Sequence, residues 1–344
     1  TETNWFFRLS AYTERLIDLI ESNELRITPA PFRDEILAFA RRGLGDISVS
    51  RSVERAHGWG IGVPGDPTQV IYVWFDALAN YISALDYGTN GDAYREWWRD
   101  VDERIHVVGK GITRFHAIYW PAFLLSAGEP LPTRIHVHPY LSVDGAKISK
   151  STGSGPSPTD IATTHGSDAL RWWITNEVSA VSDTDFTIDR LVDNANNTLA
   201  NGLGNAINRI ATIRHRTSHP EPPPPDTDPL PETANLSAHV AGALANFDRR
   251  RASDHIVTAI GDVNRHIELN APWQLAKDPA RQHELHRLLD TYTATLTAIA
   301  RAIEPITPDL ATRAIQQLAN DSTTKPTPIY ARLDADQTPL QAAR

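Results

Sequence analysis

The sequence predicts an α/β domain built on parallel β-strands, followed by an all-α domain. Three short apolar runs rich in strand-forming residues lie at residues 69–75, 105–108 and 134–138, and each leads into a turn, a loop or a helical pattern. This alternation is typical of parallel βαβ units. From residue 191 onward, apolar residues instead recur at helical spacing over long segments, which predicts a bundle of helices.

Length and composition indicate a globular chain with more than one domain. It has 344 residues, of which 41% are hydrophobic and 22% charged, and no apolar run is long enough to span a bilayer. We therefore expect a cytoplasmic protein without a membrane partner. The net charge of −9 argues against general binding of nucleic acid, so we expect any RNA contact at local basic patches such as residues 209–216.

Two residue types are missing from the chain. Cysteine is absent, which excludes zinc held by thiolates, and we expect no zinc site within these residues. Methionine is absent as well, so the chain has no start residue. We therefore expect a fragment or a processed product.

The first 140 residues carry the predicted α/β elements. Helical spacing appears over residues 4–23 and 32–44, and residues 47–53 alternate like a strand. The runs at 69–75 and 105–108 resemble strands buried on both faces, with helices expected from residue 76 and over 112–126. Ligands bind beyond the carboxyl ends of parallel strands, so we expect a site assembled from the three strand ends at Trp74, Gly109 and His138.

Residues 143–153 hold two lysines, Lys147 and Lys150, among serines and glycines. A loop of this composition cannot pack a core, but its ammonium groups and backbone N–H donors suit a polyphosphate. The segment therefore predicts an ATP site. For the isolated pentapeptide, a flexible surface loop is the alternative.

The remaining chain is helical apart from a proline-rich stretch. We expect helices over residues 160–175 and 191–216, and three or more helices from residue 234 to residue 320. Between them, the prolines of residues 219–226 predict an extended, polyproline-like excursion at the surface.

Seven segments stand out together: Asn4–Ser10, Val73–Ala77, Gly109–Pro121, Lys147–Ser151, Leu199–Asn205, Ala271–Trp273 and Tyr330–Asp334. In this order, over nearly the whole chain, they resemble the class I methionyl-tRNA synthetases. The resemblance implies the second half of a Rossmann-like, parallel-sheet nucleotide-binding domain and an α-helical anticodon-binding bundle. The implied segments are the end of a connective insertion, expected to be mainly helical (1–68), the half catalytic domain (69–140), the lysine loop with a stem-contact linking region (141–190), and the bundle (191–344), with a Pro-rich loop at 219–233.

The resemblance implies ATP chemistry for the lysine loop. Residues 147–151 resemble the family's Lys-Met-Ser-Lys-Ser sequence, with Ile148 in place of Met. The implied reaction is attack of an amino-acid carboxylate on the α-phosphorus of ATP, with Mg²⁺ accompanying the nucleotide. Positioning and charge neutralisation dominate such catalysis, so we expect Lys150 and then Lys147 to bind the leaving pyrophosphate, with Ser149 and Ser151 in the same catalytic loop.

The implied ATP site also includes Gly109, Gly111, His138 and Lys150. At position 111 the family has an acid that helps to hold the ribose hydroxyls, whereas this chain has glycine. A missing charge-assisted hydrogen bond weakens binding by about 1.5–3 kcal/mol. Gly111 therefore indicates a weakened or a repurposed enzyme.

The amino-acid pocket implied by the family consists of Trp74, Ala77, Tyr81, Ile112, His116 and Trp120. Aromatic walls with one neutral imidazole suit a thioether, so methionine or a similar amino acid is the implied substrate. From helical spacing alone, His116 and Trp120 are expected in a packed core.

The implied anticodon-binding residues are Asn205, Arg209 and Trp273. RNA loops are bound by stacking bases on aromatic rings and by hydrogen bonds to base edges. Taken singly, Trp273 fits a packing residue at a helix end, and Asn205 with Arg209 an ordinary surface pair. Taken together, the three favour tRNA(Met) as a partner.

We therefore expect the carboxyl-terminal part of a methionine-tRNA ligase, which activates methionine with ATP and transfers it to tRNA in translation. The family's His-x-Gly-His signature is absent, so the chain alone is expected not to form the adenylate, and a missing N-terminal segment or separate chain is an expected partner. Two alternatives stay open. One is a paralogue that joins an amino acid to a small-molecule acceptor in specialised metabolism, which Gly111 favours. The other is a non-catalytic tRNA-binding module, which the missing half favours.

Overall fold

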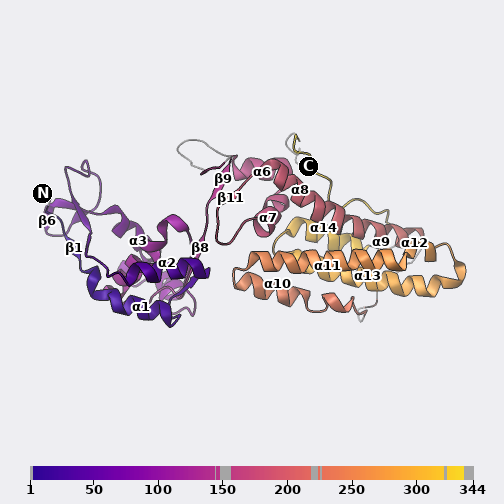
Figure 1. Ribbon diagram of the computed structural model, residues 1–344, viewed down its shortest axis with the longest axis horizontal. Coiled ribbons are helices and arrows are strands. Elements are labelled where there is room, and N and C mark those ends of the chain that lie inside the picture. The colour runs from indigo at the N-terminus through magenta and orange to yellow at the C-terminus, as the bar shows by residue number, and fades with distance from the viewer. Residues whose placement is uncertain are drawn as a thin grey trace. The chain divides into compact units, whose positions relative to one another are not determined.

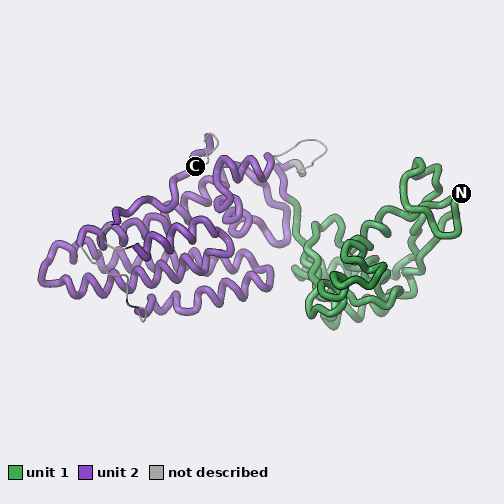
Figure 2. The backbone as a smooth tube through the Cα atoms, turned by 180° about the vertical axis from the view of Figure 1, so that it is seen from behind, with its two compact units in different colours: residues 1–140 green, residues 141–344 purple. Residues whose placement is uncertain are grey.

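The computed structural model describes residues 3–143, 145–147, 156–217, 224, 227–320 and 324–336. The chain divides into two compact units, residues 1–140 and 141–344 (Figure 2). Each unit contains its own cluster of buried hydrophobic residues. The finer division at residues 68 and 190 stays a prediction.

A three-stranded parallel sheet lies in unit 1. Its central strand is β8 (Arg134–His138), and its neighbours are β2 (Arg26–Thr28) and β7 (Ile105–Gly109). Both neighbours run parallel to β8. The apolar runs predict strands at β7 and β8 correctly, but β7 is not buried on both faces, because Ile105 and Val107 are exposed while His106 and Val108 are buried. β2 gives no strand signal because Ile27 is its one apolar residue.

One face of this sheet packs against helices. Ile27, Ile135 and Val137 are buried in a common core with residues of three helices. The helices are α1 (Thr13–Glu21), α2 (Ala30–Ala40) and α5 (Trp120–Ala127). The helical patterns at residues 4–23 and 32–44 thus correspond to α1, preceded by a short 3₁₀ turn at Leu9–Tyr12, and to α2.

The run at residues 69–75 is not a strand of the parallel sheet, and that prediction is wrong. The run divides between the end of an antiparallel strand, β6, and the first turn of a helix, α3. A short apolar run cannot by itself distinguish a buried strand from the start of a helix. The elements concerned are β4 (Ser50–Ser52), β5 (Gly62–Val63), β6 (Asp66–Ile71) and α3 (Val73–Ser83), with β6 antiparallel to both β4 and β5.

The alternating residues 47–53 form two short strands rather than one. β3 (Ile47–Ser48) pairs antiparallel with β1 (Phe6–Phe7), and the following residues form β4.

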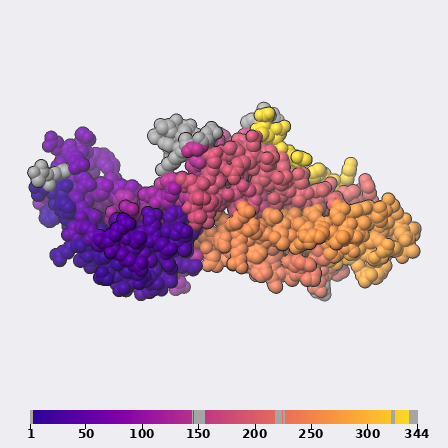
Figure 3. All heavy atoms as spheres, viewed as in Figure 1, coloured from indigo at the N-terminus to yellow at the C-terminus, as the bar shows by residue number. Residues whose placement is uncertain are grey.

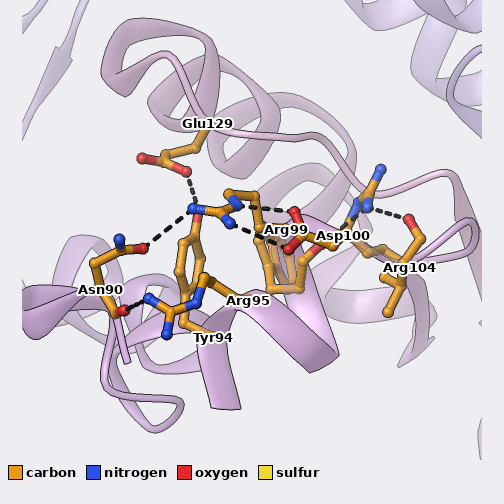
Figure 4. A network of polar contacts seen from close by, with 9 residues as sticks. Asn90, Tyr94, Arg95, Arg99, Asp100, Arg104 and Glu129 are labelled. Atoms are coloured by element: carbon orange, nitrogen blue, oxygen red, sulfur yellow. Dashed lines mark hydrogen bonds and ion pairs between the residues drawn. The ribbon is translucent and has the colours of Figure 1, made fainter. Parts of the chain in front are cut away.

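The connection between α3 and β7 is fixed by polar contacts (Figure 4). It contains α4 (Asp92–Tyr94) and the π-helical segment η3 (Arg95–Arg99). The Tyr94 hydroxyl donates a hydrogen bond to the carboxylate of Glu129. Burial and this bond raise the pKa of Tyr94. Arg99 Nε lies 2.8 Å from the carboxylate of Asp100.

Unit 2 begins with a small sheet. β9 (Leu141–Val143) pairs antiparallel with β10 (Ala146–Lys147) and parallel with β11 (Thr184–Asp185). The pattern at 160–175 forms two helices, α6 (Pro158–His165) and α7 (Ser167–Asn176), because Gly166 adopts φ +89° between them.

The rest of unit 2 is helical, and its long helices α11 and α13 pack side by side (Figure 1). Their residues fall in the orange part of the surface in Figure 3. Its core includes Leu203, Ile207, Ile256 and Leu296. The elements are α8 (Ile188–Ala195), the π-helical η6 (Asn196–Gly204), α9 (Asn205–Arg216), α10 (Leu236–Ala245), α11 (Arg249–Asn270), α12 (Pro272–Leu275), α13 (Gln282–Ile303) and α14 (Pro308–Ala319).

Two expectations concern the remaining segments. The predicted polyproline stretch lies outside the described residues except for Pro224. No described helix has the length and apolar character needed to cross a membrane.

Candidate functional site

Four of the six predicted pocket residues meet in unit 1. Tyr81 comes from α3, Ile112 from the 3₁₀ turn η4 (Lys110–Ile112), His116 from the π-helical η5 (Phe115–Tyr119), and Trp120 from α5. The Tyr81 hydroxyl lies 2.8 Å from His116 Nε2, and His116 Nδ1 lies 3.0 Å from the Ile112 carbonyl oxygen. The ring of Trp120 lies 6.2 Å from that of Tyr81.

These hydrogen bonds define the tautomer of His116. A carbonyl oxygen can only accept, so Nδ1 carries the proton and donates to Ile112. Nε2 is then left to accept from the Tyr81 hydroxyl. Burial lowers the pKa of His116, which keeps the ring neutral at pH 7. The cluster therefore presents an oriented, uncharged imidazole.

His106 on β7 belongs to the same cluster. Its ring lies 4.3 Å from that of Tyr81, 5.6 Å from His116 and 5.9 Å from Trp98. Burial, with a smaller effect of His116, lowers the pKa of His106 to about 4. Among the described residues, His106 Nε2 and Trp120 Nε1 are buried and meet no hydrogen-bond partner. Such atoms are uncommon in folded proteins.

Trp74 lies on a neighbouring cavity. Its ring stacks on Phe115 with a centroid distance of 4.1 Å and an interplanar angle of 23°. Both rings line a cavity of about 360 Å³ whose other walls include Tyr72 and Phe123. Trp74, Ala77 and Tyr81 follow one face of α3, because they are three and four residues apart. Phe115 therefore lines the cavity, whereas the next residue, His116, belongs to the polar cluster.

Gly109 and His138 end neighbouring parallel strands. They are register partners, and a Cβ atom built on Gly109 would lie 3.6 Å from His138 Cε1. His138 is exposed, and its Nδ1 donates to the Pro139 carbonyl at 2.9 Å. The two residues thus share the carboxyl edge of the sheet, as predicted, whereas Trp74 does not end a strand.

The lysine loop is described only at its base. Lys147 pairs through its backbone with Ser142 in the β9–β10 hairpin. The Asp185 carboxylate accepts from the Ser142 hydroxyl at 2.8 Å and from the Gly145 N–H at 3.0 Å, which ties the hairpin to β11. Ser149, Lys150 and Ser151 lie outside the described residues.

Two of the three predicted RNA-binding residues are in contact in unit 2. The Arg209 guanidinium lies 4.9 Å from the Trp273 ring centroid, a cation–π distance, and Arg209 Nη2 lies 2.7 Å from Glu268 Oε1. Asn205 is exposed one turn earlier on α9. Trp273 reaches α9 because α11 ends at the left-handed Ala271.

The profile of the family described as tRNA synthetases class I (M) matches residues 1–211, which is more than half of the chain. The chain belongs to the class I methionyl-tRNA synthetases. The "Methionine--tRNA ligase" of Caldanaerobacter subterraneus is 36% identical over 325 residues, which cover 92% of this chain and 50% of the relative. The Brucella suis protein of the same name is 36% identical over 327 residues, which cover 92% and 61%.

Solved structures of methionyl-tRNA synthetases resemble this synthetase chain as well. The Mycobacterium tuberculosis enzyme bound by methionyl-adenylate has a TM-score of 0.79 and 31% identity, over 95% of this chain and 68% of that chain. Its free form has a TM-score of 0.81 and 30% identity, over 97% and 69%. The predicted family is confirmed, and so is a fold with a parallel sheet and extensive helix.

This synthetase chain spans about half to three-fifths of the length of these curated relatives. The finer assignment, half of a Rossmann-like domain and an anticodon-binding bundle, stays a prediction.

Sequence analysis missed two residues of these sites. His106 is hidden inside an apolar run, where alternation does not show which face is buried. Glu268 is one charge among many on a long helix.

Proposed function

We propose that the gene product containing these residues activates methionine with ATP and transfers it to tRNA(Met). The carrying observation is the cluster of Tyr81, His116, Ile112 and Trp120, which brings predicted pocket residues together in a chain of this family. The solved relative bound by methionyl-adenylate supports the same chemistry.

The pocket residues suit an uncharged side chain. A thioether cannot form an ion pair, so a charged group beside it would be buried without a partner, and a neutral imidazole avoids that cost. Aromatic rings also make favourable contacts with sulfur. The hydrogen bonds from Tyr81 and to Ile112 hold the imidazole in one orientation, so that its position is set before the substrate binds. His106 and Trp98 back the Tyr81 and Trp120 rings.

The carboxyl edge at Gly109 and His138 is the proposed nucleotide-binding edge, since ligands of parallel sheets bind there. Lys150 and Lys147 would neutralise the leaving pyrophosphate, and Ser149 and Ser151 would belong to the same loop. Among the described residues, no group of three or more His, Asp or Glu side chains is placed to hold a metal ion. Mg²⁺ is commonly bound through the phosphates of its nucleotide. When bound with ATP, Mg²⁺ would supply charge neutralisation.

Unit 2 is the proposed RNA-binding part. Arg209 is held between the Trp273 ring and Glu268, so its guanidinium is positioned and Trp273 keeps part of its ring accessible. A base that stacks on Trp273 would meet the donors of Arg209 and the amide of Asn205 one turn away.

Methionine-dependent ATP–pyrophosphate exchange by the full-length gene product tests the first step. We expect exchange that Lys150→Ala lowers at least a hundredfold, because one charge-neutralising contact to the transition state is lost. The matched control is His239→Ala, an exposed residue on α10. Residues 1–344 alone are expected to give no exchange, and clear exchange by this chain would contradict that expectation.

Gly111 favours a second candidate, a paralogue that transfers the activated amino acid to a small molecule. Charging of tRNA by the full-length gene product, across a panel of amino acids, separates the two: methionylated tRNA supports the ligase, and activation without charging supports the paralogue. A pure RNA-binding module would bind tRNA and give no exchange at all.

A further inference from the structure

The side chain of Tyr140 fills the space beside Gly111. Gly111 follows the end of β7 on η4, and Tyr140 lies two residues after the end of β8. A Cβ atom built on Gly111 would lie 2.0 Å from the Tyr140 hydroxyl oxygen and 3.3 Å from its Cζ. Nonbonded carbon and oxygen atoms do not approach to 2.0 Å. The Tyr140 hydroxyl therefore occupies the space that a side chain at position 111 would need.

The ring of Tyr140 is held there from two sides. Lys110 Nζ lies 5.0 Å from the ring centroid, within the range of a cation–π interaction. A Cβ atom built on Gly109 would lie 3.7 Å from Tyr140 Cε1, so the ring packs close to the end of β7. Because an aromatic ring is rigid, the hydroxyl can leave position 111 only if the whole ring turns away from both contacts.

The hydroxyl also lies where a ligand of this sheet is expected. Tyr140 is half-buried, Gly111 is exposed, and both are at the carboxyl edge of the parallel strands. A phenolic hydroxyl is neutral and can both donate and accept a hydrogen bond. This chemistry matches an alcohol hydroxyl better than a phosphate, whose charge is better met by lysine.

We infer that Tyr140 binds a sugar hydroxyl of the nucleotide, and that the missing side chain at Gly111 is what admits it. The inference rests on the proposed ATP-dependent function. Glycine at position 111 then does not leave the sugar without a partner. The contact from an acid after the end of β7 is replaced by a contact from the neutral hydroxyl of Tyr140, which follows the neighbouring strand β8.

Equilibrium binding of ATP and of 2′,3′-dideoxy-ATP to the full-length gene product tests this inference. We expect the native protein to prefer ATP, and Tyr140→Phe to lower that preference about three- to tenfold, the size of one neutral hydrogen bond. Binding of the dideoxy nucleotide should be unchanged by Tyr140→Phe, which serves as the internal control. Circular dichroism melts show whether each variant folds.

Substitutions at position 111 test whether a side chain there and the Tyr140 hydroxyl compete for the same space. Gly111→Asp in the native background should weaken ATP binding, because its Cβ atom would meet the Tyr140 hydroxyl and push the ring out of place. In the Tyr140→Phe background, Gly111→Asp should restore the preference for ATP, whereas Gly111→Ala should fit without restoring it. The two variants differ by one polar group at the same position.

The outcomes separate the inference from the proposed function. ATP binding with an unchanged preference in Tyr140→Phe would overturn the inference and leave the function standing. An equal loss of ATP affinity from Gly111→Asp in the native and Tyr140→Phe backgrounds would also overturn the inference, because the Tyr140 hydroxyl would then not fill the space at position 111. No ATP binding by the folded native protein would remove the proposed function, and the inference with it.

Discussion

Replacing His106 by phenylalanine should remove a pH-dependent part of the stability of unit 1. In an unfolded chain a histidine has a pKa near 6.5, whereas burial lowers the pKa of His106 to about 4. Between these values the unfolded state binds a proton that the folded state does not, so the free energy of unfolding falls as the pH falls. The loss begins near pH 6.5, is complete below pH 4, and amounts to about 3 kcal/mol.

Phenylalanine is the informative replacement because it keeps an aromatic ring beside Tyr81 and Trp98, at centroid distances of 4.3 and 5.9 Å in the native protein. It removes the titrating group and the buried, unpaired Nε2. Burial also lowers the pKa of His116 and of His165, and both contribute the same sign of pH dependence. Since they are present in both proteins, the difference between native protein and variant isolates His106.

Urea unfolding at pH 7.0 and pH 4.5, followed by tryptophan fluorescence, measures the difference. We expect the native protein to lose about 2–3 kcal/mol more than His106→Phe between the two pH values. His239→Phe, on an exposed residue, should behave like the native protein. Equal losses in the native protein and in His106→Phe would refute the argument, because His106 would then titrate alike in the folded and unfolded states.

Three further predictions concern the pocket, unit 2 and the α3–β7 connection. Tyr81→Phe should raise the KM for methionine in pyrophosphate exchange by up to about tenfold, because it removes the hydroxyl bonded to the imidazole, and should leave the KM for ATP unchanged; an unchanged methionine KM would contradict it. Trp273→Ala should weaken tRNA binding by about tenfold or more in a filter-binding assay, whereas Trp59→Ala, a tryptophan that is 72% exposed in unit 1, should not; equal effects would exclude a specific role. Glu129→Gln should lower the free energy of unfolding by about 1 kcal/mol in urea, since the bond from Tyr94 loses its charge, and no change would mean that this bond contributes nothing to stability.

The parallel sheet shows what local patterns can predict. β7 and β8 were predictable because each is a run of apolar residues bounded by a turn. β2 was not, because a three-residue strand with one apolar side chain has no pattern, and it pairs with a strand more than one hundred residues away. The wrong strand at residues 69–75 has a related origin, since a short apolar run has the same local pattern whether it ends a strand, as β6 does, or begins a helix, as α3 does.

In the candidate site, too, residues within a sequence motif were predictable and residues placed by tertiary contacts were not. His116 and Trp120 could be proposed because they belong to a long motif, although spacing alone would have placed them in a core. His106 and Tyr140 could not, because their roles depend on strand register and on a glycine in another segment. Register and close approach are tertiary properties, and they decide which side chains share a pocket.

Strand β7 links the two proposed substrate sites. Its side chains alternate, so His106 and Val108 are buried while Ile105 and Val107 are exposed. His106 therefore packs against Tyr81 of the amino-acid pocket, and Gly109, at the end of the same strand, lies at the nucleotide edge. Three strand residues span about 10 Å. A one-residue slip of β7 against β8 would turn His106 to the exposed face and move Gly109 from His138, so the pairing of these two strands positions both sites at once.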